Sequence, residues 1–134
     1  MDRTTARICA VKLVYEWELG GDGGDETLVR LLEVQPDEPE TDYMRQLFNG
    51  VREHKAELDA LIAGHLRANW SLERMAKVDH AILLVAVYEM KHTDTGESVA
   101  INCAIDIAKE YSTDKAGAFI NGVLGSISRQ AANE

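Results

Sequence analysis

Apolar side chains recur every three or four residues along most of the chain, which is the spacing of amphipathic α-helices. The spacing is present over residues 5–19, over residues 41–67 and again in the last third of the chain. Between the first two segments, GGDGG at 20–24 and the prolines Pro36 and Pro39 interrupt the pattern and predict loops. A short apolar helix, Glu26–Glu33, is expected between those loops, so the pattern predicts an all-α fold.

One segment is apolar at every position rather than periodic. Ala81 to Tyr88 is an unbroken run of eight apolar residues, and periodicity alone does not distinguish a buried strand from a buried helix here. No other segment alternates like a strand, so a strand at this place would have no partner. We therefore expect a central helix over Lys77–Lys91, buried on most sides. The run is far shorter than the roughly 20 apolar residues that cross a bilayer.

Polar residues at the borders of the periodic segments predict where the helices begin. Thr41, Ser98 and Asp114 are expected to cap the long helix and the last two helices, because their side-chain oxygens accept bonds from unpaired backbone N–H groups. Ser71 is expected to cap a short turn that ends at Met75.

The charge of the chain is uneven. Its 134 residues, enough for one domain, carry a formal net charge of −9. Nine of the acids lie between Glu18 and Asp42, where Arg30 is the one base, so the rest of the chain is nearly neutral and leaves room for a basic face. The N-terminus has no apolar signal-peptide core, which predicts a cytoplasmic protein. Cys9 and Cys103 are expected to be reduced packing residues.

No pattern of residues indicates catalysis. The motifs of zinc hydrolases, phosphate-binding loops and nucleophile elbows are missing from the sequence. His54 and His65 lie eleven residues apart on one predicted face, without the four-residue spacing of a helical metal pair, so packing is favoured over ligation. Asp79 and His80 are adjacent, and a helix directs them about 100° apart, which argues against a catalytic pair. We expect a binding protein with no enzymatic activity, no cofactor and no metal.

Several strings of residues, taken in order, resemble the NusB transcription-antitermination family. The first helix contains Ala6-Arg7-x-Cys9-Ala10-Val11-x-x-x-Tyr15, and the long helix contains Asp42-Tyr43-x-x-x-Leu47-x-x-Gly50-Val51 and then Leu58-Asp59-x-x-Ile62. The middle contains Trp70-x-Leu72-Glu73-Arg74-Met75-Ala76-x-Val78-Asp79-x-Ala81-Ile82-Leu83. The end contains Ala100-Ile101-Asn102-x-Ala104-Ile105-x-Ile107-Ala108-Lys109-x-Tyr111 and Phe119-Ile120-Asn121-Gly122-Val123-Leu124-Gly125. The resemblance covers the chain from Ala6 to about Ile127, apart from the loop around 20–40.

The resemblance implies a fold and a function. It implies a single NusB-like domain over 1–134 with about seven helices, in an N-terminal subdomain of about 1–68 and a C-terminal subdomain of about 69–134. It also implies a bacterial factor that binds single-stranded boxA RNA of ribosomal RNA leaders together with NusE, a small-subunit ribosomal protein, within the transcription elongation complex. A homodimer that covers the arginine-bearing surface is left open.

The family's functional positions can be carried over residue by residue. The arginine-rich start of the family falls on Arg3 and Arg7, and Tyr15 is expected to help form the same surface. Phe119 and Asn121 fall on positions expected at the RNA face, where an aromatic ring stacks on a base and an amide bonds its edge. Asp79 falls on the acidic position expected to contact NusE.

Departures from the family's pattern leave other functions open. Thr4 and Thr5 stand where basic residues are usual, Cys103 replaces a glutamate and Gly96 stands where proline is common. Without the resemblance, Phe119 would be a core residue and the arginines part of a solvated face. The alternative function is therefore a NusB-like protein-interaction module that has lost much of its RNA binding. A methyltransferase, in which this domain also occurs, would need a further catalytic domain.

Overall fold

The computed structural model describes residues 1–21, 30 and 41–132, and this part of the chain contains helices and no strand. Five α-helices and one 3₁₀ turn are present in it: α1 Arg3–Glu18, α3 Asp42–Ala63, η2 Leu72–Arg74, α4 Lys77–His92, α5 Glu97–Tyr111 and α6 Asp114–Ala132. The all-α prediction is confirmed. The expected number of about seven helices is not reached in this part of the chain, and the predicted helix Glu26–Glu33 lies outside it except for Arg30.

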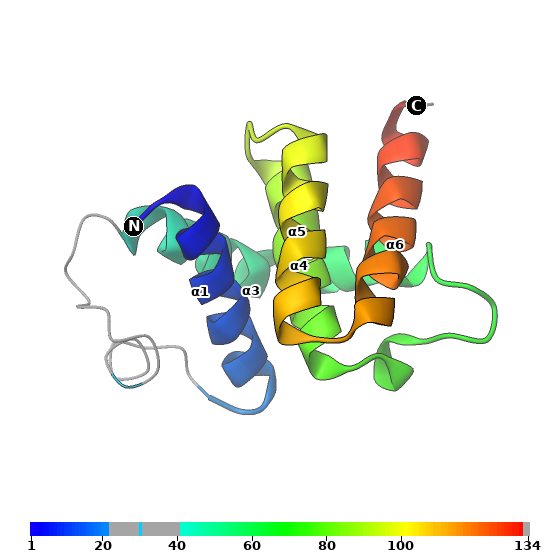
Figure 1. The fold of residues 1–134 in the computed structure, drawn as a ribbon, viewed down its shortest axis with the longest axis horizontal. Coiled ribbons are helices and arrows are strands. Elements are labelled where there is room, and N and C mark those ends of the chain that lie inside the picture. Colours follow the sequence, from blue (N-terminus) through cyan, green and yellow to red (C-terminus); the bar gives the residue numbers. More distant parts are fainter. Residues whose placement is uncertain (22–29, 31–40, 133–134) are drawn as a thin grey trace.

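Helix α4 is the centre of the molecule, as the unbroken apolar run predicts. Every residue from Asp79 to Met90 is buried, and α4 packs against α1, α3, α5 and α6 (Figure 1). Leu83 and Leu84 have no exposed surface, and burial of one such side chain contributes about 1.5–3 kcal/mol. Among the described helices, none has both the length and the apolar content to cross a membrane.

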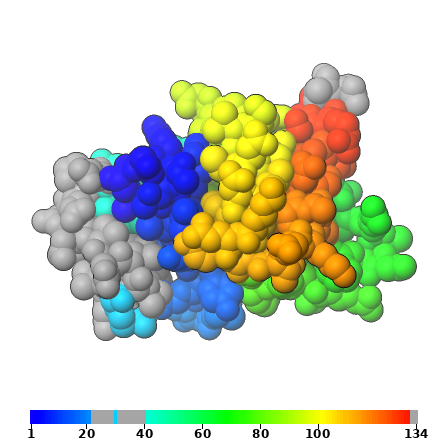
Figure 2. All heavy atoms as spheres, in the orientation of Figure 1, coloured from blue at the N-terminus to red at the C-terminus, as the bar shows by residue number. Residues whose placement is uncertain are grey.

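The other helices surround α4 in two groups. α1 and α3 pack against one side of it, and α5 and α6 form an antiparallel pair joined by a short turn. On the face drawn in Figures 1 and 2, α5 lies between α1 and α6. The division of the chain into two subdomains near residue 68 stays a prediction.

The helix ends differ from the expected caps at three of four positions. Ser71 caps η2 as expected, since its hydroxyl accepts from the backbone N–H of Arg74 at 3.3 Å. Thr41 occupies the N-cap position of α3 but its side chain makes no capping bond, and its hydroxyl accepts from Nε of Arg45 at 3.2 Å. Ser98 lies inside α5, which begins one residue earlier after Gly96.

The cap of α6 is also one residue away from the expected one. Asp114 is the first helical residue, and the hydroxyl of Thr113 accepts from the backbone N–H of Ala116 at 3.1 Å. A cap that the periodicity did not indicate begins α1, where Oδ1 of Asp2 accepts from the N–H of Thr5 at 2.7 Å. Short polar residues are frequent near helix starts, so composition alone does not select the capping one.

Candidate functional site

A groove at one end of the molecule contains Phe119. It has a volume of about 830 Å³ and lies between α6, the start of α4 and the segment 65–75. Trp70, which is 44% exposed, meets Phe119 edge to face with ring centroids 6.1 Å apart. The side chains that line it are those of His65, Leu66, Arg67, Ala68, Asn69, Trp70, Met75, Asp79, Thr113, Lys115, Ala116, Ala118, Phe119 and Val123, with Arg129 and the backbone of Gly122. We call this surface the Phe119 groove.

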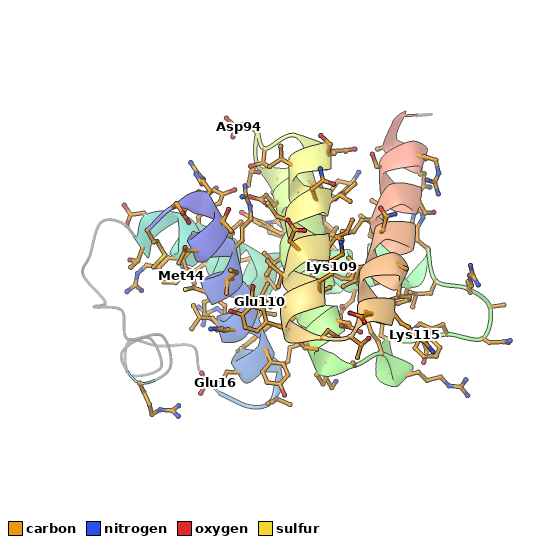
Figure 3. All side chains as sticks on the ribbon, viewed as in Figure 1. Glu16, Met44, Asp94, Lys109, Glu110 and Lys115 are labelled. Carbon is orange, nitrogen blue, oxygen red and sulfur yellow. The ribbon has the colours of Figure 1, made fainter. Side chains whose placement is uncertain are left out.

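Three cations lie along the Phe119 groove. Arg67, Lys115 and Arg129 line it, and Figure 3 shows Lys115 at the N-terminal end of α6. Within the described residues, none of the three pairs with a carboxylate. Unpaired cations beside an aromatic ring suit a nucleic-acid strand, because phosphates attract the cations and bases stack on the ring.

Asp79 supplies an acceptor in the same groove. It is 9% exposed, and its Oδ1 is buried without a hydrogen-bond partner among the described residues. A buried oxygen that lacks a donor costs about 1–3 kcal/mol, and a molecule bound in the groove would reach this oxygen only if the side chain turned outward. Sequence reasoning placed Asp79 at a protein contact. The structure places it among the residues that line the Phe119 groove, and its contact with NusE stays a prediction.

Arg7 is buried on the inner side of α1. Its Nε donates to both carboxylate oxygens of Glu89 at 2.8 and 2.9 Å, and its Nη1 lies 3.4 Å from Sγ of Cys103. Arg7 is 6% exposed and Glu89 1%. Burial lowers the pKa of Arg7, but the hydrogen bond and charge of Glu89 outweigh burial and raise it. The guanidinium therefore ties α1 to α4 and faces the interior.

Arg3 is exposed at the start of α1. Its guanidinium lies over the ring of Tyr43, 3.5 Å from the centroid, and the Tyr43 hydroxyl donates to Glu89. Such a stack orients an exposed cation while the cation keeps most of its contact with water. Arg3 and Arg7 lie four residues apart, yet one is exposed and the other is buried.

A second charged cluster ties the end of α1 to α3 and α4. Nε2 of His80 donates to Oδ1 of Asp59 at 2.6 Å, and its Nδ1 lies 3.1 Å from a carboxylate oxygen of Glu18. Lys55 also donates to Asp59, at 2.6 Å. Burial lowers the pKa of His80, but the bonds and charges of Asp59 and Glu18 outweigh burial and raise it to about 9. Thus His80 is a cation in the folded protein at neutral pH.

Tyr15 lines a different groove, between α1, α4 and α5. Tyr15 and Tyr111 are 39% and 41% exposed, and Lys12 lies over the Tyr111 ring, 5.1 Å from its centroid. The remaining side chains that line it are Ile8, Val11, Glu16, Val78 and Ile107, and we call this surface the Tyr15 groove. Val78 lines the Tyr15 groove and its neighbour Asp79 lines the Phe119 groove. The two grooves therefore meet the start of α4 from different sides.

The structure brings together only some of the predicted site residues. Phe119 and Asp79 share a groove, whereas Arg3 and Tyr15 lie on α1, from which α5 separates α6 (Figure 2). Asn121 is exposed on α6 but is two residues beyond Phe119, so the helix turns it about 200° away, and it does not line the groove. The groove also contains Trp70 and three cations that sequence reasoning did not select. The signal in the sequence that could have identified Trp70 was a tryptophan within a largely polar segment.

The sequence matches known proteins along nearly its whole length. The family model described as "NusB family" matches residues 4–129. A transcription antitermination protein NusB from Clostridium botulinum is 37% identical over 143 residues, which cover 95% of this chain and 99% of that protein. The protein of the same name from Bacillus velezensis is 41% identical over 128 residues, with 95% of each chain covered.

Solved structures agree with the sequence match. The fold is similar to a crystal structure of the antitermination factors NusB and NusE in complex with dsRNA, with a TM-score of 0.84, 27% identity and 96% of both chains covered. It is also similar to NusB of T. maritima, with a TM-score of 0.82, 32% identity, and 96% of this chain and 92% of that chain covered. The chain belongs to the NusB family.

Proposed function

We propose that the chain is a transcription antitermination factor that binds single-stranded boxA RNA of ribosomal RNA leaders together with NusE. The observation that carries the RNA part is the Phe119 groove, in which an aromatic pair and three cations share one surface. A relative of the same fold occurs in complex with NusE and dsRNA, which supports NusE and RNA as the classes of partner.

In this proposal the Phe119 ring stacks on one unpaired base. Lys115 with Arg67 contacts the flanking phosphates, and the contact of Asp79 with NusE stays a prediction. RNA contact by Arg3 stays a prediction, since α5 lies between α1 and α6, whereas Arg7 holds α1 in place through Glu89. RNA contacts by Tyr15 and Asn121 stay predictions.

NusE is assigned to the Tyr15 groove. Two half-exposed tyrosines over an apolar floor are typical of protein interfaces, in which aromatic residues are enriched. The floor includes Val78, so a protein bound there lies next to Asp79 at the start of α4. A shared RNA-binding surface of the two proteins would then form around that point, within the elongation complex.

Fluorescence anisotropy of a boxA-like RNA, measured over a salt series with and without NusE, tests this function. Each phosphate contact on a single strand contributes a slope of about −0.7 in log affinity against log salt. Lys115→Ala should therefore make the slope shallower by about 0.7. Lys91→Ala is the matched control, since Lys91 is exposed at the other end of α4, about 18 Å along the helix from Asp79.

A lack of preference for boxA RNA would contradict the proposed recognition. If the wild-type chain binds boxA RNA no better than a scrambled RNA even with NusE, the proposed recognition of boxA is wrong. NusE binding alone would then support the second function, a protein-interaction module. The pairing of Arg7 with Glu89 favours that alternative, because it removes one arginine from the surface.

A further inference from the structure

Three polar side chains from two helices meet at the surface, away from both grooves. His54 and Glu57 lie one turn apart on α3, and His92 is the last residue of α4. Nδ1 of His54 and Nε2 of His92 donate to different oxygens of the Glu57 carboxylate, at 3.2 and 3.1 Å. One donor atom from each residue lies within 4.8 Å of the other two.

The geometry points to a binding site for a divalent transition-metal ion, with zinc as the ion, held by His54, Glu57 and His92. Two imidazole nitrogens and a carboxylate oxygen are a donor set that zinc takes in proteins, with a fourth position left for water. Around tetrahedral zinc, ligands at about 2.0–2.2 Å lie roughly 3.3 Å from each other. The three side chains therefore need to approach by at most about 1.5 Å, and they are exposed enough to do so.

Stacked rings hold the imidazoles in place before any ion arrives. The His92 ring stacks on His54 with centroids 4.2 Å apart and on Tyr88 with centroids 5.1 Å apart. Tyr88 is itself fixed against α3, because a Cβ at Gly50 would lie 2.0 Å from its Cζ atom. The stacking keeps the two imidazoles adjacent, and to bind one ion the rings turn so that their in-plane nitrogen lone pairs converge on it.

Charge and access at this cluster also favour a cation. Glu57 supplies a carboxylate, the one acidic group of the cluster, to balance part of the charge of a bound cation. The C-terminal end of α4 adds the partial negative charge of its carbonyl groups. The His54, His92 and Glu57 side chains are 35%, 27% and 56% exposed, so an ion reaches them from solvent. A bound zinc would link the middle of α3 to the end of α4.

Calorimetric titration of the untagged protein with zinc chloride at about pH 7.5, where most imidazoles are neutral, tests the site. One zinc per chain is expected. Two variants should each bind zinc at least about tenfold more weakly: the double variant His54→Ala/His92→Ala and the near-isosteric Glu57→Gln. Mutation of residues that only hydrogen-bond to metal ligands already weakens metal affinity by about 10- to 100-fold. His65→Ala is the matched control, because it removes a histidine bonded to Ser126 and not to this cluster.

A second measurement keeps the test valid if a variant unfolds. In imidazole NMR spectra of the wild-type protein, zinc should move the His54 and His92 signals and leave those of His65 and His80 in place. The proposal is overturned if zinc moves the signals of other histidines instead. It is also overturned if the folded double variant binds zinc as tightly as the wild type, or if the wild type binds none.

Discussion

Charged side chains in the contact of α1 with α3 and α4 are paired with each other, whereas the cations of the Phe119 groove have no carboxylate partner in the described residues. Arg7 with Glu89, and His80 with Asp59, satisfy each other inside the protein. Arg67, Lys115 and Arg129 surround an aromatic pair on an open surface. The difference separates charges that hold the framework from charges available to a partner.

The comparison also explains the different environments of two neighbouring arginines. Arg7 and Arg3 are one turn apart, but only Arg7 points at a buried carboxylate of α4. A buried ion pair is costly to break, because the remaining charge is left without a partner. The first helix therefore has one structural arginine and one surface arginine, and a count of its arginines does not give the number available to a partner.

The largest effect is expected from breaking the Arg7 pair. Arg7→Met leaves Glu89 buried without its guanidinium and should lower the free energy of unfolding by about 3–5 kcal/mol, as measured by urea denaturation. The matched substitution Arg3→Met removes only an exposed stack on Tyr43 and should cost no more than about 1 kcal/mol. Equal losses from the two would contradict the division into framework and surface charges.

The second effect concerns the His80 cluster and pH. The folded-state pKa of His80 is about 9, above its ordinary value of 6.5, so the folded protein holds this proton more tightly than the unfolded chain. The stability from the protonated ring is fully present below pH 6.5 and is lost as the pH rises through about 9. Its total is at most about 3 kcal/mol. Denaturation across this range should show the decline, and the decline should be absent in His80→Gln.

Alanine substitutions at two glycines should change stability by smaller amounts and in opposite directions. Gly50→Ala puts a Cβ into the Tyr88 ring and should destabilise the protein by about 1–3 kcal/mol through overpacking. Gly122→Ala, at an exposed position that lines the Phe119 groove, meets no atom within 4 Å and should stabilise α6 by up to about 1 kcal/mol. Thermal unfolding of both variants checks the opposite signs. Destabilisation by Gly122→Ala would mean that the groove is more closely packed than described.

Local patterns predicted the helices and the central position of α4, since periodicity and an unbroken apolar run depend on nearby residues. The partners of buried charges were not predictable in this way. Glu89 lies 82 residues from Arg7, and the sequence gives no sign that they pair. For the same reason the spacing of His54 and His65 pointed away from a metal site, whereas the packing of α3 on α4 brings His54 to His92.

The groove illustrates the same limit for the candidate site. The resemblance selected Phe119, and the fold adds Trp70 and Lys115 around it from separate segments. Asp79 matches the family's acidic position in sequence, and its expected contact with NusE stays a prediction. Its neighbour Val78 does face the Tyr15 groove, so one residue of helical rotation decides which surface each side chain joins.

The affinity of Phe119 variants for a boxA-like RNA in the presence of NusE tests the central claim most directly. Loss of a stacking ring costs about 1–3 kcal/mol per base, so Phe119→Leu should weaken binding roughly 5- to 150-fold, while Phe119→Tyr keeps the ring and should bind nearly as the wild type does. Circular dichroism and denaturation establish that both variants are folded. If folded Phe119→Leu binds this RNA as tightly as Phe119→Tyr, the groove does not hold a base and the account is contradicted.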